Sequence, residues 1–401
     1  MPCDTKSVMP NPLQTCANRS LLLDRFADPH AKEDGRKSFF AGAIGKPFLR
    51  CKKDSWQLFL QSALNLKPEE LIVGKSQARL MVNMAGGVME NAGLCLDRLS
   101  GIPFIPGSAI KGCARRMAIQ EVLELTELDG KAKHLESLAL VFGWGDAEWK
   151  DGRAKDKKTG KNKGLYSDFE YACGEGKPWE MVRAKVSQEL AIRLKIKAKD
   201  AMPVWKQLPA YAGLASFLPA YPQSSPLPDL ELDVLTCHHP DYYRGELEMP
   251  VALDTESPVP VVFPALAPGH LFCFAVIGRD QKLVAQARSW LRNGLQIFGI
   301  GAKTAAGYGW FDCAESATNE LAASIDKEIE VKKHQPAGDF NEIIFSNAVL
   351  KRLVKKGEWG QLQKEIEKLA KPQNKEWLSK FLQATTGKEH KDLRAKDWYP
   401  K

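Results

Sequence analysis

Two glycine-containing turns combine residue types that suit the binding of a phosphate group. The first, IPGSAIKG at residues 105–112, places Ser108 after a Pro-Gly pair, where a helix N-cap is expected. The first amides of a helix lack partners inside the helix and lie at its positive end, so they attract anions. Lys111 adds a flexible charge one turn later, and Arg115 follows on the same face. A capped helix with a solvated basic face is the simpler interpretation of this segment alone.

The second turn, FGIGAKTAAGYGWF at residues 298–311, carries a Lys-Thr pair between glycines. Because glycine has no Cβ, such a loop lets backbone amides approach a phosphodiester closely. A tight packing loop would explain the glycines but gives no reason for the Lys-Thr pair. An aromatic ring here could stack on a base or sugar. The residues that we single out are Gly299, Gly301, Lys303, Thr304, Gly307, Tyr308 and Gly309.

The second turn does not match a nucleotide-binding P-loop. That motif needs a glycine directly before its lysine, and here the residue before Lys303 is Ala302. The turn also follows a predicted helix and precedes a predicted strand, which reverses the order of a P-loop. We therefore exclude an NTPase of this class.

The composition is that of a soluble globular protein with a mild basic excess. The chain has 401 residues, 44% of them hydrophobic and 26% charged, so it can bury a sizeable core. A formal net charge of +8 suits a polyanionic partner but decides little alone, because an ordinary enzyme can carry it too. The nine cysteines include no C-x-x-C pair, which argues against a disulfide framework or a zinc ribbon. Without a signal-peptide core or a long apolar run, we expect a cytoplasmic protein that does not enter membranes.

Hydrophobic periodicity predicts where the regular elements lie. We expect helices over residues 55–65, 108–125 and 282–299, and strands over 71–84 (with a possible break at Gly74), 164–172 and 271–277. Residues 230–243 should begin as a strand and end as a loop. The proline-rich segment 202–228 predicts an irregular connection. The order strand, Pro-Gly turn, helix, strands, helix, glycine-rich loop, strand is that of an α+β fold of the RRM-like (ferredoxin-like) kind with long insertions.

Shifts in composition predict three parts of the chain. Residues 1–70 form an N-terminal extension that is partly helical, and residues 71–315 form the core. A basic loop at 146–164 is inserted in that core. Residues 316–401 form a lysine-rich helical extension.

The motifs resemble those of the RAMP superfamily of CRISPR-associated RNA-binding proteins. GIPFIPGSAIKGCAR and FGIGAKTAAGYGWF carry the resemblance. DVLTCHHPDYYRG, followed by DTESPVPVVFPALAPGHLFCFAV, narrows it to the family of the sixth RAMP subunit of the type III-B (Cmr) effector complex. Four ordered motifs over roughly residues 71–315 make the resemblance specific. Position by position it matches Ser108, Lys111, Gly112, Arg115, the glycine-rich loop residues named above, and His239, Asp241, Tyr242 and Tyr243.

The resemblance implies a RAMP core and an RNA-binding, non-catalytic role in antiviral defence. It places the protein at the end of the complex that holds the 3′ part of the CRISPR RNA, and it includes His239 and Tyr242 among the RNA-binding residues. The implied partners are CRISPR RNA, target RNA, the backbone RAMP subunit, the small helical subunit and, in many complexes, the first RAMP subunit of the Cmr complex. It implies no cofactor, and it assigns target cleavage to the backbone subunit.

A metal site near residue 238 is disfavoured by strand geometry. Cys237, His238, His239 and Asp241 are potential ligands, but adjacent histidines on an extended chain point to opposite faces. No second Cys/His cluster in the sequence supplies further ligands. We therefore expect no metal.

Other functions remain open at this point. A metal-independent RAMP endoribonuclease would need a base and a cation, for which His238 or His239 with Lys303 is the obvious set. A metal-dependent nuclease would instead use an aspartate such as Asp97 or Asp254. A third alternative is a mainly structural subunit that touches neighbours and little RNA.

Overall fold

The computed structural model describes most of the chain between residues 11 and 317. The described residues are 11–46, 60, 64, 66–67, 70–145, 147–149, 167–199, 202–224, 229–245, 251–252, 254–314, 317 and 361. The chain divides into two compact units, Met1–Leu321 and Ala322–Lys401. Nearly all described residues belong to the first unit, so the predicted helices in 316–401, most of the basic loop and nearly all of the helix at 55–65 lie outside them. No helix within the described residues has the length and apolarity that a membrane span needs.

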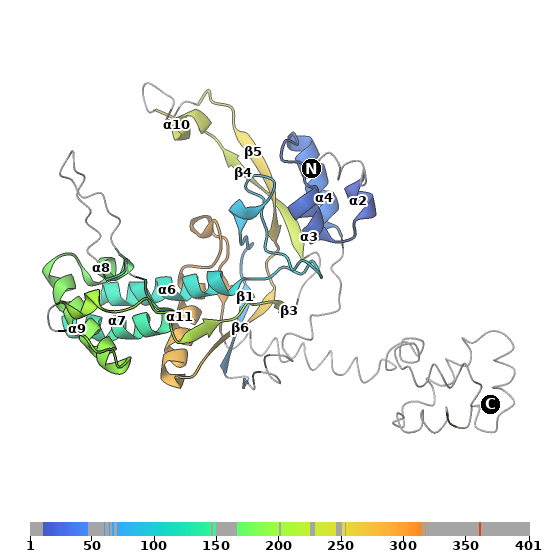
Figure 1. The fold of residues 1–401 in the computed structure, drawn as a ribbon. Helices are drawn as coiled ribbons and strands as arrows, with labels where there is room; N and C mark the ends of the chain where they lie inside the picture. Colours follow the sequence, from blue (N-terminus) through green and yellow to red (C-terminus); the bar gives the residue numbers. More distant parts are fainter. Residues whose placement is uncertain are drawn as a thin grey trace. The chain divides into compact units, whose positions relative to one another are not determined.

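The core is an antiparallel sheet in which β6 is central (Figure 1). The strand order is β2-β6-β1-β7, and β3 also pairs with β6. The strands are β1 (Leu71–Ser76), β2 (Ala215–Phe217), β3 (Pro222–Ser224), β6 (Leu271–Gly278) and β7 (Phe311–Asp312). Val73 lies opposite Cys273 of β6, and Lys75 lies opposite Asp312 of β7, so β1 lies between these two strands.

Two long helices, α6 (Gly107–Glu124) and α11 (Gln281–Ile297), pack together on one face of this sheet. The predicted apolar stripe of α11 is confirmed from Leu283 to Gly294, and Trp290 is fully buried. A Cβ on Gly294 would lie 2.9 Å from the backbone oxygen of Cys113, so glycine permits the close approach of the two helices. This packing sets the position of both predicted turns, because α6 follows the first and α11 precedes the second.

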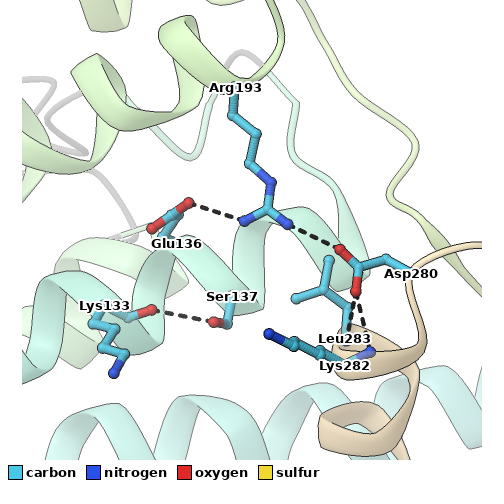
Figure 2. Close-up of polar contacts among 7 residues, drawn as sticks. All are labelled: Lys133, Glu136, Ser137, Arg193, Asp280, Lys282 and Leu283. Atoms are coloured by element: carbon cyan, nitrogen blue, oxygen red, sulfur yellow. Dashed lines mark hydrogen bonds and ion pairs between the residues drawn. The ribbon is translucent and has the colours of Figure 1, made fainter.

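An inserted helical layer covers α6 and is drawn in teal to green in Figure 1. It consists of α7 (Leu128–Phe142), α8 (Asp168–Cys173) and α9 (Lys177–Arg193). Arg193 ties this layer to the core, since its guanidinium lies 3.3 Å from Glu136 of α7 and 2.9 Å from Asp280 (Figure 2). Asp280 also caps α11 by accepting from the backbone N–H groups of Lys282 and Leu283. Arg193 of α9 therefore bridges α7 and the N-terminus of α11.

A two-stranded ribbon, β4 (Leu230–Cys237) with β5 (Val259–Leu266), extends from the sheet and carries α10 (Pro240–Arg244) at its far end (Figure 1). N-terminal elements pack beside it: α2 (Pro12–Thr15), α3 (Arg19–Leu21), the π-helix η1 (Leu22–Phe26) and α4 (Glu33–Ile44). Arg36 of α4 donates to the backbone oxygen of Val262 at 2.9 Å. Short 3-10 turns complete the fold: η4 (Met84–Gly86), η5 (Val204–Lys206) and η6 (Thr304–Ala306).

The α+β class, the strand at 271–277 and the helix at 282–299 are confirmed, and the strand expected at the start of 230–243 is β4, which ends at Cys237. The strand at 71–84 is too long, because β1 ends at Ser76. The strand at 164–172 is wrong: Ser167 accepts from Glu170 N–H and starts the helix α8 there. The segment 202–228 is not wholly irregular, because the edge of β6 recruits β2 and β3 from it.

A buried ion pair anchors the N-terminal helices to the ribbon, and its removal should destabilise the fold. Arg19 and Asp229 are almost fully buried and form a bidentate pair, and Arg19 also donates to the Gly101 backbone oxygen at 2.7 Å. We expect Arg19→Ala to cost about 3–5 kcal/mol of unfolding free energy, because it leaves a buried carboxylate without its partner. Urea unfolding measures this, with Lys185→Ala, which breaks an exposed pair, as the control. Equal effects of both variants would contradict the argument.

Candidate nucleic-acid interface

The first turn starts α6 one residue earlier than the sequence predicts. Pro106 is the N-cap residue, with φ −68° and ψ 147°, and no side chain caps the helix. Ser108 is therefore not the N-cap, and it lies exposed in the first turn. The cause is tertiary: a Cβ on Gly107 would lie 2.2 Å from the backbone oxygen of Phe217, so this glycine is pressed against β2.

One face of α6 carries all four predicted residues of the first turn. Ser108 and Gly112 are exposed, and Lys111 and Arg115 are half-buried. A Cβ on Gly112 would meet nothing within 4 Å, so the surface beside Lys111 is open. Burial and then the charge of Arg115 lower the pKa of Lys111, and an anion bound here would offset both effects.

Arg115 is already neutralised by carboxylates. Its guanidinium pairs with Glu148 at 3.4 Å and with Asp168; Glu148 lies near the start of the loop at 146–164, and Asp168 follows that loop. It also lies 5.9 Å from the centroid of the Phe169 ring. Lys111, by contrast, forms no ion pair with any residue that the structure describes. The face therefore offers an anion the ammonium of Lys111, whereas the Arg115 guanidinium is held by its two carboxylate partners.

The glycines of the second turn allow close backbone packing. Gly301 and Gly309 have φ values of +94° and +71°. A Cβ on Gly301 would lie 2.2 Å from the Met81 oxygen, and a Cβ on Gly309 would lie 1.9 Å from the Ile300 oxygen. These contacts support the packing interpretation for both glycines.

Several amides of this loop donate into the protein itself. Ala302 N–H donates to the Met81 oxygen and Gly309 N–H to the Arg79 oxygen, each at 2.7 Å. Gly307 differs from its neighbours, since it is exposed, has φ +90° and would place a Cβ in open space. Gly307 is thus the glycine at which a ligand backbone could come close.

Lys303 has a left-handed backbone conformation, with φ +60°. Residues other than glycine adopt this conformation at a cost of roughly 1–2 kcal/mol. Its backbone oxygen accepts from Ala306 and Tyr308, which closes the turn η6. Its ammonium lies 4.8 Å from the centroid of the Phe263 ring in β5. The turn therefore projects the lysine towards the base of the ribbon.

Tyr308 ties the loop to the ribbon. Its hydroxyl donates to the Asp233 carboxylate in β4, which also pairs with Arg79 at 3.4 Å. Burial and the hydrogen bond to Asp233 raise the pKa of Tyr308 to about 12. Sequence reasoning missed Arg79 and Asp233, because neither belongs to a recognisable motif. The hydroxyl of Tyr308 is therefore bonded within the protein.

The two turns belong to elements in direct contact. The Cys113 thiol in the second turn of α6 lies 3.6 Å from the Gly299 oxygen at the start of the loop. The guanidinium of Arg116 lies 4.2 Å from the centroid of the Phe298 ring. Helix α6 therefore contacts the glycine-rich loop through Cys113 and Arg116, which at 3.6 residues per turn lie on the opposite side of the helix from Lys111.

The HHPDYY part of the DVLTCHHPDYYRG motif lies elsewhere, at the far end of the ribbon (Figure 1). His239 Nδ1 is 3.9 Å from Glu256 Oε1. Tyr242 and Tyr243 are 40% and 75% exposed, with ring centroids 5.4 Å apart. The backbone of Asp241 is described, but its side chain lies outside the described part. The thirteen predicted RNA-binding residues thus fall into two groups.

The candidate nuclease set is spread along the ribbon. Phe263, which Lys303 contacts, lies opposite Asp233, and Cys237 lies four positions further along β4, roughly 13 Å at strand rise. His239 lies beyond Cys237. Within the described residues, no group of three His, Cys, Asp or Glu side chains is placed to hold a metal ion.

Comparison with known proteins identifies the family. The RAMP superfamily profile matches residues 84–312, which is more than half of the chain and includes both turns. The chain belongs to the RAMP superfamily. This confirms the superfamily that the motifs predicted, and it accounts for the presence of α6 and the glycine-rich loop in one core.

The individual proteins that this chain resembles share 30% sequence identity with it or less. The CRISPR system Cmr subunit Cmr6 of Pyrococcus furiosus is 30% identical over 237 residues, which are 59% of this chain. This chain spans 65% of the length of that relative. Among solved structures, a cryo-EM structure of the type III-B Cmr-beta bound to cognate target RNA is 17% identical, with a TM-score of 0.38, and covers 72% of this chain and 76% of its own. The crystal structure of Cmr6 from Pyrococcus furiosus is 22% identical, with a TM-score of 0.29 and coverages of 61% and 97%.

The packing of the loop predicts unequal effects of two glycine substitutions. Gly309→Ala should destabilise the fold strongly, because the new methyl group overlaps the Ile300 oxygen. Gly307→Ala has a similar positive φ but meets nothing, so we expect a cost of about 1 kcal/mol. Thermal unfolding of both variants measures the difference. A Gly309→Ala protein as stable as Gly307→Ala would show that the loop is not packed in this way.

The Tyr308 hydrogen bond predicts a pH-dependent contribution to stability. Because folding raises the pKa of this phenol from 10.0 to about 12, its contribution is complete below pH 10 and is lost as the pH rises through about 12. The stability difference between the wild type and Tyr308→Phe should therefore shrink over this range. Urea unfolding at several pH values measures it. A difference that is constant with pH would mean that the hydroxyl is not bonded to Asp233.

Proposed function

We propose that this protein is a non-catalytic RNA-binding and assembly subunit of a type III-B (Cmr) CRISPR ribonucleoprotein. Membership of the RAMP superfamily and 30% identity to a Cmr6 protein support the assignment. The observation that carries the RNA-binding role is the contact between helix α6, which bears Lys111, and the glycine-rich loop, which bears Lys303. In this proposal the two turns bind one sugar-phosphate strand.

Each turn supplies an ammonium group beside a glycine that leaves its surface open. Lys111 lies next to Gly112, and Lys303 lies four residues before Gly307. A phosphate can approach the backbone at both glycines, because a Cβ there would occupy open space. Such contacts recognise the backbone of the nucleic acid and not its sequence, which suits a subunit whose guide RNA reads the target.

The remaining parts of the proposal concern the fold and the partners. The strand order β2-β6-β1-β7, with α6 and α11 on one face, supports an RRM-like core. We propose that this core holds the 3′ part of the CRISPR RNA beside the target RNA. The exposed tyrosines at the end of the ribbon suit contact with a neighbour such as the backbone RAMP subunit, and the small helical subunit and the first RAMP subunit complete the proposed neighbourhood.

Removing either ammonium group should weaken RNA binding equally across sequences. We expect Lys111→Ala and Lys303→Ala each to reduce the slope of log affinity against log salt by about one unit per lost phosphate contact. Filter binding or fluorescence anisotropy with single-stranded RNAs of unrelated sequence, over a series of salt concentrations, measures the slope.

Lys185→Ala is the matched control for this experiment. It removes one positive charge from α9, where the ammonium pairs with Asp129, so the net charge falls by the same amount. Its slope should equal that of the wild type. If the slopes of Lys111→Ala and Lys303→Ala also remain unchanged, the phosphate-binding role of the two turns is wrong.

A further inference from the structure

Trp310 presents an exposed aromatic ring next to the glycine-rich loop. Its side chain is 37% exposed, whereas most tryptophans that the structure describes are buried in the core. Tyr308 is half-buried and its hydroxyl is bonded to Asp233. Of these two rings beside the loop, Trp310 is therefore the more accessible for stacking with a base.

We propose that Trp310 is a stacking platform for one unpaired base of the bound RNA. This inference rests on the proposed function, and it adds a base contact to the phosphate contacts. The ligand class is an unpaired nucleobase of any sequence, because each of the four bases has a face that can stack on indole.

The structure fixes the indole before any ligand arrives. Its Nε1–H donates to the Thr304 backbone oxygen at 3.3 Å, and its backbone oxygen accepts from Gln77 at 2.8 Å. The next residue, Phe311, is buried with its ring against Phe272 and Phe274. A side chain held at both ends loses little conformational entropy when a base stacks on it, which favours binding.

The position of Trp310 relates it to Lys303. The indole donates to the residue that directly follows Lys303, so the ring lies beside the turn that carries the ammonium group. A strand whose phosphate meets Lys303 would thus have a neighbouring base within reach of Trp310. Trp310 directly precedes β7, and it is exposed whereas Phe311 packs in the core together with the two helices.

The surrounding charges also favour the Trp310 side over the Tyr308 side. Tyr308 faces Asp233, and Glu231 lies two residues away on the same strand. Arg79 pairs with both carboxylates, so it does not present a free cation to a phosphate. A base beside Tyr308 would therefore meet two carboxylates, whereas the Trp310 indole is bonded to a backbone oxygen.

The test compares variants of Trp310 in the full-length chain, using single-stranded RNA and an abasic ribose-phosphate oligomer of equal length. We expect Trp310→Ala and Trp310→Leu to weaken RNA binding by roughly 5- to 150-fold, the range for loss of one base–aromatic stack. Trp310→Phe should retain most of the affinity, since it keeps an aromatic face. All three should bind the abasic oligomer as the wild type does, and their salt slopes should not change.

Trp310→Leu and Tyr171→Ala are controls for loss of apolar bulk and for loss of an exposed ring elsewhere. Leucine retains apolar bulk, so a loss of RNA binding without a change in thermal midpoint points to the missing ring. Tyr171 is 56% exposed on α8, and its substitution should leave RNA affinity unchanged. Quenching of wild-type tryptophan fluorescence by RNA, lost in Trp310→Phe, gives a second reading of the same contact.

Two outcomes separate this inference from the proposed function. If Lys303→Ala weakens RNA binding but Trp310→Leu binds like the wild type, the stacking platform is wrong and the phosphate site stands. If the wild type shows no salt-dependent affinity for either oligomer, the proposed function itself is wrong. Equal losses on RNA and on the abasic oligomer would also overturn the platform, because stacking requires a base.

Discussion

The close backbone contact between the glycine-rich loop and residues 79–81 is the constraint on which the site depends. Gly301 lets the loop lie against Met81 and Gly309 lets it close on Ile300, and two hydrogen bonds of 2.7 Å to the oxygens of Met81 and Arg79 hold it there. The same loop contains the left-handed turn at Lys303, and hydrogen bonds to Asp233 and to Thr304 fix Tyr308 and Trp310. Glycine is needed here chiefly because two stretches of backbone meet, and only Gly307 leaves space for a ligand.

Ion pairing divides the cations of the site into two kinds. Arg115 and Arg79 are paired with carboxylates and stabilise the arrangement of helices and ribbon around the loop. Lys111 and Lys303 project from the two turns, and they have the flexible, strongly hydrated ammonium groups that suit phosphate contacts. The structural role of the arginines explains how a surface can be basic in sequence and yet offer few free charges.

Local patterns predicted much of the framework around the site. The 3.6-residue stripe of α11, the alternation in β4 and the continuous apolar run of β6 each depend on neighbours in sequence, so they were recognisable. Segment 164–172 misled because its aromatic residues favour a strand, whereas the Ser167 cap and burial of Phe169 against the inserted layer make it helical. The short strands β2 and β3 form because β6 offers an edge, which no local pattern reports.

The sequence by itself determined the superfamily, the two turns and the lysines that they carry, because these are features of residue type and short spacing. Only the tertiary structure decided which groups are free. Tyr308 meets Asp233 75 residues away in sequence, and Arg115 meets Asp168 at a separation of 53. Such partners depend on strand register and on the packing of helices. The exposure of Trp310 is likewise seen only in the fold, where Phe311 is buried in the core and the neighbouring indole is not.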